Sequence, residues 1–246
     1  MPSASLAQFP DVARPDPAGP RPPYRFVAAL ALLGAALLTA GTLLHPGHAD
    51  PGSPAAAFAE YAGVSRGEWV AAHLVQLGGV AGLVVLVVML ARAVDGTRGS
   101  AWARVTTVFA TAALATAAVL QAVDGVALKA VVDLWSGAGE DRSALFVGAL
   151  VVRQVEIGLD ALFALLLAVA FLAVGMGLLA APNGSRGLGA LAVVAAGAAA
   201  VNGVALALSG FSAATMLATT VSGAVALVWM LLAAVWSWRR SVLHRP

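Results

Sequence analysis

Six apolar stretches, each long enough to cross a bilayer as a helix, dominate this sequence of 246 residues. They cover residues 25–45, 69–92, 102–124, 144–180, 187–208 and 214–238. A transmembrane helix needs about 20 predominantly apolar residues. Charged residues make up only 11% of the chain, whereas a soluble domain carries about 25%. Because no soluble fold of this size can bury so much apolar surface, the sequence predicts an all-α polytopic membrane protein, a bundle of six transmembrane helices.

Basic residues are distributed unequally between the two sets of loops. On one side are Arg14, Arg21, Arg25, Arg92, Arg98, Arg104, Arg186, Arg239, Arg240 and Arg245. The other side has only Arg66, Lys129 and Arg142. Since cytoplasmic loops carry the excess of Lys and Arg, both termini are predicted to be cytoplasmic. The Ala-, Gly-, Val- and Arg-rich composition is typical of a GC-rich bacterial genome, so we expect a multi-pass protein of a bacterial plasma membrane.

Composition also divides the chain and excludes several functions. Residues 1–24 contain seven prolines without an apolar period and are predicted to be a disordered cytoplasmic tail. Residues 25–238 form the transmembrane domain, and residues 239–246 form a basic cytoplasmic tail. The absence of cysteine excludes thiolate metal sites and iron–sulfur clusters. The basic residues are not clustered, which argues against nucleic-acid binding.

The scarce ionisable residues of the apolar stretches fall at one depth. A helix rises about 1.5 Å per residue, so about 20 residues cross the hydrocarbon core. Counting that distance from the cytoplasmic end of four helices reaches His45, His73, Asp124 and Asp160, with Glu156 one turn further out. We therefore expect these side chains to meet at the outer boundary of the membrane.

Helical spacing gives each group of polar residues a common face. Residues Arg153, Glu156 and Asp160 are spaced i, i+3, i+7. Residues Trp69, His73 and Gln76 form a second stripe, and Gln121 and Asp124 form a third. Intramembrane ionisable groups usually face the interior of a bundle and mark a functional site. The stripes therefore predict a shared polar pocket that opens to the extracytoplasmic side.

The residue types suggest how such a pocket would work. His45, His73 and Glu156 are predicted ligands of a divalent metal, since two imidazoles and a carboxylate bind Zn, Fe or Mn. A haem held by His45 and His73 is less favoured, because aromatic residues make up only 7% of the chain. Gln76 and Gln121 are predicted to contact a cofactor. The predicted catalytic residues are Asp124, Arg153 as anion clamp or counter-ion, and Glu156 or Asp160 as proton carrier.

Two functions remain open at this stage. The protein is either a membrane enzyme or cofactor-binding protein acting on a lipophilic small molecule, or a non-catalytic small transporter or accessory subunit. In the second case the charges form a structural network, with Arg153 paired to Asp124 or Glu156. One arginine cannot neutralise three carboxylates, so a proton, a metal or a ligand must complete the balance. Residues 54–61, residues 126–135 and the start of the fourth apolar stretch are predicted to cover the pocket as a lid.

Overall fold

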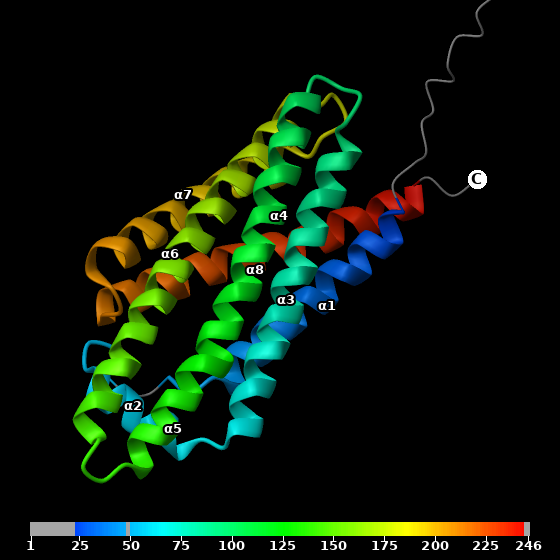
Figure 1. Cartoon of the computed structure of the whole chain (residues 1–246). Coiled ribbons are helices and arrows are strands. Elements are labelled where there is room, and N and C mark those ends of the chain that lie inside the picture. The colour runs from blue at the N-terminus through cyan, green and yellow to red at the C-terminus, as the bar shows by residue number, and fades with distance from the viewer. Residues whose placement is uncertain (1–22, 48–49, 244–246) are drawn as a thin grey trace, which may run out of the picture.

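The computed structural model describes residues 23–47 and 50–243, and this part of the chain is helical with short connections (Figure 1). The predicted disordered tail lies mostly outside the described residues. The elements in chain order are α1 (Tyr24–Leu44), α2 (Pro54–Gly63), α3 (Arg66–Ala93), α4 (Ser100–Ala122), the π-helix η1 (Val123–Leu128), α5 (Lys129–Gly137), α6 (Arg142–Ala180), α7 (Arg186–Ser209) and α8 (Ala213–Leu243).

Within the described residues, six helical bodies are long and apolar enough to cross a membrane. They are α1, α3, the continuous run from α4 through η1 to α5, α6, α7 and α8. The prediction of an all-helical bundle with six apolar helices is therefore confirmed. Helix α6 has 39 residues, about twice the length that a bilayer core requires. The run from Ser100 to Gly137 has 38 residues, so these two helices extend well beyond a single membrane thickness.

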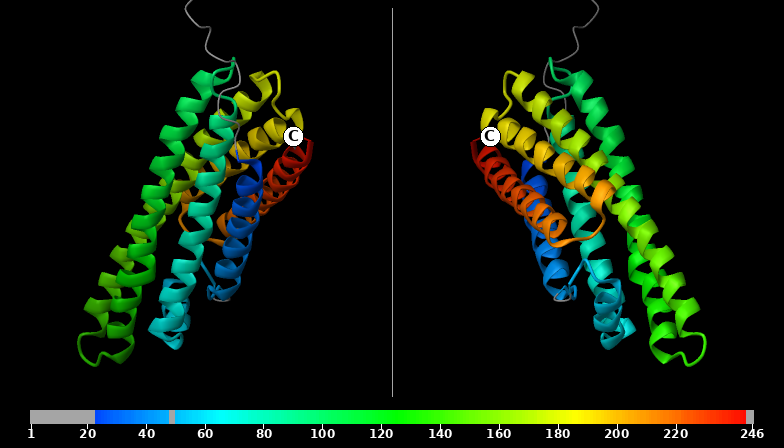
Figure 2. Two further views of the ribbon diagram at one scale, coloured as in Figure 1. Left: turned by 90° about the vertical axis from the view of Figure 1, so that its right-hand side faces the viewer. Right: turned by 90° about the vertical axis from the view of Figure 1, so that its left-hand side faces the viewer.

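The six long helices form a closed ring. Helix α3 packs on α1 and α4, α6 packs on α4 and α7, and α8 packs on α7 and α1. Figure 2 shows α3 in cyan between α1 and the hairpin that contains α4 and α6. The described chain begins and ends at the same end of the bundle (Figure 1). The aromatic side chains of Tyr24 and Trp236 meet there, with their centroids 5.7 Å apart. Helix α8 continues through Arg239 and Arg240, so these residues are helical.

Helices α1 and α3 approach each other unusually closely. A Cβ added to Gly82 would lie 2.7 Å from the Cα of Gly34, and one added to Gly79 would lie 2.5 Å from the backbone nitrogen of Leu38. Small residues allow this contact in a membrane, where helices associate through packing. The same contact continues to Gly41, where an added Cβ would meet the backbone of Gln76. The C-terminal end of α1 is thereby held beside the first turns of α3.

The predicted lid segments pack on one another at the end of the ring opposite the described termini. Phe58 of α2 is fully buried against Trp135 of α5 and Phe146 of α6, with ring centroids 6.1 and 5.6 Å apart. Lys129 at the start of α5 is also buried. It donates a hydrogen bond to the carbonyl of Tyr61 at 3.0 Å and pairs with Asp133. These contacts attach α2 to the extension of α4 and close the bundle at this end.

Candidate metal centre

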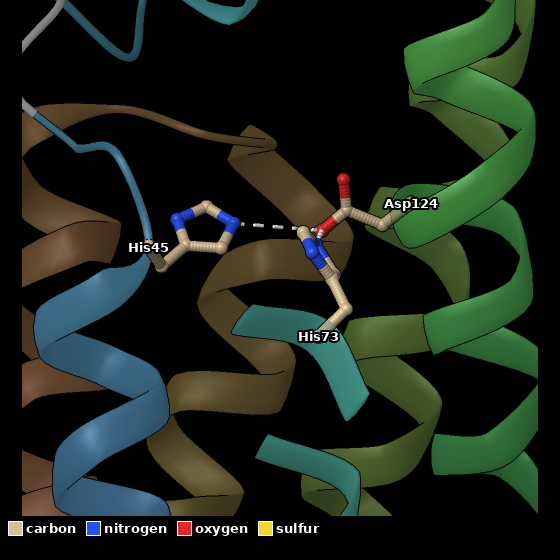
Figure 3. A group of neighbouring side chains, drawn as sticks. All are labelled: His45, His73 and Asp124. Atoms are coloured by element: carbon tan, nitrogen blue, oxygen red, sulfur yellow. Dashed lines mark hydrogen bonds and ion pairs between the residues drawn. The ribbon is translucent and has the colours of Figure 1, made fainter. Parts of the chain in front are cut away.

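Three potential metal ligands from three different helices converge beneath this cap (Figure 3). His45 caps the C-terminal end of α1, His73 lies in the third turn of α3, and Asp124 belongs to η1. The Oδ2 atom of Asp124 is 2.8 Å from Nε2 of His73 and 3.8 Å from Nε2 of His45. One ligand atom of each residue lies within 4.8 Å of the other two. Figure 3 shows both imidazoles turned toward the same carboxylate.

Backbone carbonyls hold both imidazoles in place. Nδ1 of His45 is 2.7 Å from the carbonyl oxygen of Pro46, and Nδ1 of His73 is 2.7 Å from that of Trp69. Because a carbonyl oxygen only accepts, each Nδ1 carries the proton and donates it. Nε2 is then left to face Asp124. Metal-binding histidines almost always donate their second ring N–H in this way, which fixes the tautomer and the ring orientation.

Local distortions of the chain bring Asp124 to His73. The last turns of α4 widen into the π-helix η1, a distortion that often occurs at functional sites. Trp69 Nε1 donates a hydrogen bond to the carbonyl of Asp124 at 3.0 Å. A Cβ added to Gly125 would lie 2.9 Å from Cβ of His73, so only a glycine permits this approach without displacement. The start of α3 is itself fixed by a capping box between Ser65 and Glu68.

An aromatic wall closes one side of the centre. The Trp69 ring lies 4.9 Å from His73, 5.3 Å from His45 and 4.7 Å from Tyr61, measured between centroids. Burial raises the pKa of the Tyr61 hydroxyl, so Tyr61 contributes a neutral phenol. Trp69 is fully buried and His73 is 2% exposed. The His73 side of the centre is therefore shielded from solvent, whereas 25% of the His45 side chain and 14% of the Asp124 side chain are exposed. Electrostatic interactions in the shielded part are stronger than in water.

Arg153 and Glu156 lie beside the centre but are not paired with each other or with Asp124. The guanidinium of Arg153 donates a hydrogen bond from Nη2 to the carbonyl of Pro51 at 3.0 Å. It also lies over the rings of Phe58 and Phe211, at 5.8 and 5.0 Å. The predicted ion pairs of Arg153 with Asp124 or Glu156 are not formed. The guanidinium points instead toward the loop that precedes α2.

The sequence predicted that Glu156 would join the two histidines, but in the structure it does not. The carboxylate grouped with His45 and His73 is that of Asp124. Glu156 is 7% exposed, and its Oε2 has no hydrogen-bond partner in the described part of the chain. It interacts electrostatically with Asp124, Arg153 and Asp160. Its predicted role as a proton carrier, shared with Asp160, stays a prediction.

The two glutamines of the predicted pocket have different surroundings. Gln76 Nε2 donates a hydrogen bond to the carbonyl of Gly41 at 3.5 Å and so links α3 to α1. Gln121 lines a small cavity next to His73, and its Oε1 is buried without a partner among the described residues. The structure thus gives Gln76 a packing role, whereas Gln121 retains an unused hydrogen-bonding atom.

Several residues of the site were not identified from the sequence. They are the carbonyls of Pro46 and Trp69, the phenol of Tyr61, and Gly125. The available signal for Gly125 was its position directly after Asp124 inside an apolar helix, since an isolated glycine there often marks a close approach. The backbone carbonyls carry no sequence signal. No protein-family model, curated protein or solved structure matches the chain.

Proposed function

We propose that this protein is an integral membrane metalloprotein that binds one divalent transition-metal ion through His45, His73 and Asp124. The observation that carries the proposal is the convergence of three ligand atoms from α1, α3 and η1 within 4.8 Å. Zn²⁺ is the first candidate, because it binds imidazole nitrogen and carboxylate oxygen. A site with three protein ligands keeps a fourth position open for water or substrate, which is typical of catalytic zinc.

The charges around the centre support a cation. Asp124, Glu156 and Asp160 bring three carboxylates, and Arg153 brings one guanidinium. Lys129 is engaged with Asp133 and does not reach this group. An unprotonated Nε2 and a carboxylate oxygen repel each other, so the 2.8 Å contact of His73 with Asp124 requires a proton or a cation between them. A divalent ion supplies the two positive charges that the surplus carboxylates need.

The arrangement suits a membrane enzyme better than a haem protein. Both Nε2 atoms face the same carboxylate oxygen, and the two imidazole centroids are only 5.0 Å apart. A bis-histidine haem needs its imidazoles on opposite faces of a macrocycle, with no carboxylate between them. A bound Zn²⁺ supplies an activated water or polarises a carbonyl. Glu156, with a free carboxylate oxygen beside the centre, would carry the proton, and Arg153 would act as counter-ion for an anionic intermediate.

A second candidate function rests on the hydrogen bonds themselves. The contact between His73 and Asp124 joins α3 to η1, and Lys129 joins α5 to α2. In a non-catalytic transporter or accessory subunit, these bonds would serve only to fix the helices. The two candidates differ in one measurable property, since only the first requires a metal.

X-ray absorption at the zinc edge of the purified, Zn²⁺-loaded protein tests the proposal. We expect a first shell at about 2.0–2.1 Å that contains two imidazoles and oxygen, with one imidazole lost in His73→Ala. A shell made only of water or carboxylate oxygens would show that the histidines do not bind the ion. A Soret absorption band of the porphyrin ring in the protein as purified would instead favour haem.

We further propose that the centre lies near the extracytoplasmic face, within reach of lipophilic molecules of the outer leaflet. The excess of basic residues at the opposite end of the ring supports this orientation. Single cysteines replacing Gly139 and Gly187 test it, because a Cβ at either position meets nothing within 4 Å and the chain has no cysteine. In intact cells, an impermeant thiol reagent should label Gly139→Cys and spare Gly187→Cys. The reverse pattern would place the centre on the cytoplasmic side.

A further inference from the structure

A cavity of about 210 Å³ lies between α3 and the junction of α4 with η1. We call it the lateral groove. Its wall is formed by Leu74 and Leu77 of α3 and by Ala118 and Val126 of the opposite helix, and its inner end is at His73 and Gln121. Leu74 and Val126 are 62% and 58% exposed on the outer surface of the bundle. The groove thus connects that surface with a residue of the candidate metal centre.

The surroundings of the groove identify what enters it. Leu74 and Leu77 lie on α3, one of the helices that can span the membrane. An exposed apolar surface on such a helix is covered by lipid hydrocarbon, which is the solvent of a bilayer. The only side chains with polar atoms that line the groove are His73, which is buried, and Gln121, whose Oε1 is buried. The groove is therefore apolar at its mouth and polar where it meets the centre.

We infer that the lateral groove admits a single-chain lipid with a terminal hydroxyl, such as a long-chain alcohol, from the bilayer. This inference rests on the proposed function, because it names the substrate class of the metal centre. An apolar cavity of about 150 Å³ holds one benzene molecule, whereas pockets that enclose a drug-sized ligand measure about 300–1,000 Å³. The volume of the groove lies between these two values. The groove would therefore hold a segment of one lipid chain, while the rest of that lipid stays in the membrane.

Gln121 would orient the lipid in the groove. Its Oε1 is buried without a hydrogen-bond partner among the described residues, and buried polar atoms almost always have one. A hydroxyl at the end of the chain would donate to this oxygen after a small rotation of the amide. The hydroxyl would then lie in the groove that His73, one of the three proposed metal ligands, also lines. A hydrocarbon without a polar end would enter the groove but leave Oε1 unsatisfied.

Photolabelling of the full chain in lipid nanodiscs tests the inference. The probe is a hexadecanol that carries a diazirine near its hydroxyl. Ala118→Trp places an indole in the groove, and Val108→Trp, on the same helix at an exposed position outside it, is the matched control. We expect labelling of residues 70–77 and 118–126 in the wild type and in Val108→Trp. Labelling of these residues should fall at least fivefold in Ala118→Trp, with zinc content unchanged in both variants.

Further results show whether the groove, the metal centre or the role of Gln121 has failed the test. Labelling spread evenly over the lipid-facing helices, or equally strong in Ala118→Trp, would overturn the groove as a binding site even if zinc is bound. Specific labelling of a protein that binds no zinc would leave the groove intact and overturn the metal centre. Gln121→Leu should weaken labelling by the alcohol but not by the matching alkane diazirine. An equal effect on both probes would overturn the orientation by Gln121.

Discussion

Replacement of Asp124 by asparagine should weaken Zn²⁺ binding by at least about 100-fold, because loss of an outer-shell partner alone costs 10–100-fold in metal affinity. Asp124 supplies the oxygen that both imidazoles face, at 2.8 and 3.8 Å. The amide keeps the shape of the side chain but removes the negative charge. A competition titration against a chromophoric chelator, in detergent, measures the affinity.

Asp141→Asn is the matched control for this substitution. Asp141 is exposed at the start of α6 and makes no side-chain cap bond, so its amide variant should bind Zn²⁺ like the wild type. Thermal unfolding of both variants separates binding from folding. If Asp124→Asn lowers the melting temperature but leaves zinc affinity at the wild-type level, the carboxylate has only a structural role and the non-catalytic function is favoured.

Gly125→Val should impair the centre while leaving all three ligands in the chain. A Cβ at this position would lie 2.9 Å from Cβ and 3.0 Å from Cγ of His73. The valine methyl groups would push the imidazole away from Asp124. Overpacking of this kind typically destabilises a protein by about 1–3 kcal/mol, and we expect zinc affinity to fall at least about tenfold, the equivalent of 1.4 kcal/mol.

Gly197→Val of α7 controls for the effect of a β-branched residue on a helix. A Cβ at Gly197 meets nothing within 4 Å, so this variant should keep both the melting temperature and the zinc affinity of the wild type. Equal behaviour of the two valine variants in both measurements would mean that the close approach of Gly125 to His73 does not position the ligand.

The six apolar helices and the common level of three site residues could be predicted from the sequence, because hydropathy and helical rise are local properties. Counting residues from the basic end of each helix placed His45, His73 and Asp124 at one level, and the structure brings these three together. The same counting could not decide how each helix is rotated about its axis. That rotation determines that Asp124, rather than Glu156, faces the histidines. The π-helix at Val123–Leu128 changes the local rotation further, and hydropathy does not reveal it.

The partner of Arg153 was unpredictable for a different reason. Arg153 donates to the carbonyl of Pro51, 102 residues earlier in the chain. Any residue can supply a backbone carbonyl, so no side-chain pattern points to this contact. Charge counting predicted surplus carboxylates, but it could not show that Lys129 pairs with Asp133, because this contact depends on how α5 packs against α2.

The number of zinc ions bound per chain by the wild-type protein tests the central claim most directly. Protein purified in detergent, loaded with Zn²⁺ and freed of excess metal by gel filtration would be measured by elemental analysis. We expect one zinc ion per chain, and close to none in Asp124→Asn treated in the same way. A wild-type protein that retains no more zinc than Asp124→Asn would contradict the assignment of His45, His73 and Asp124 as a metal centre.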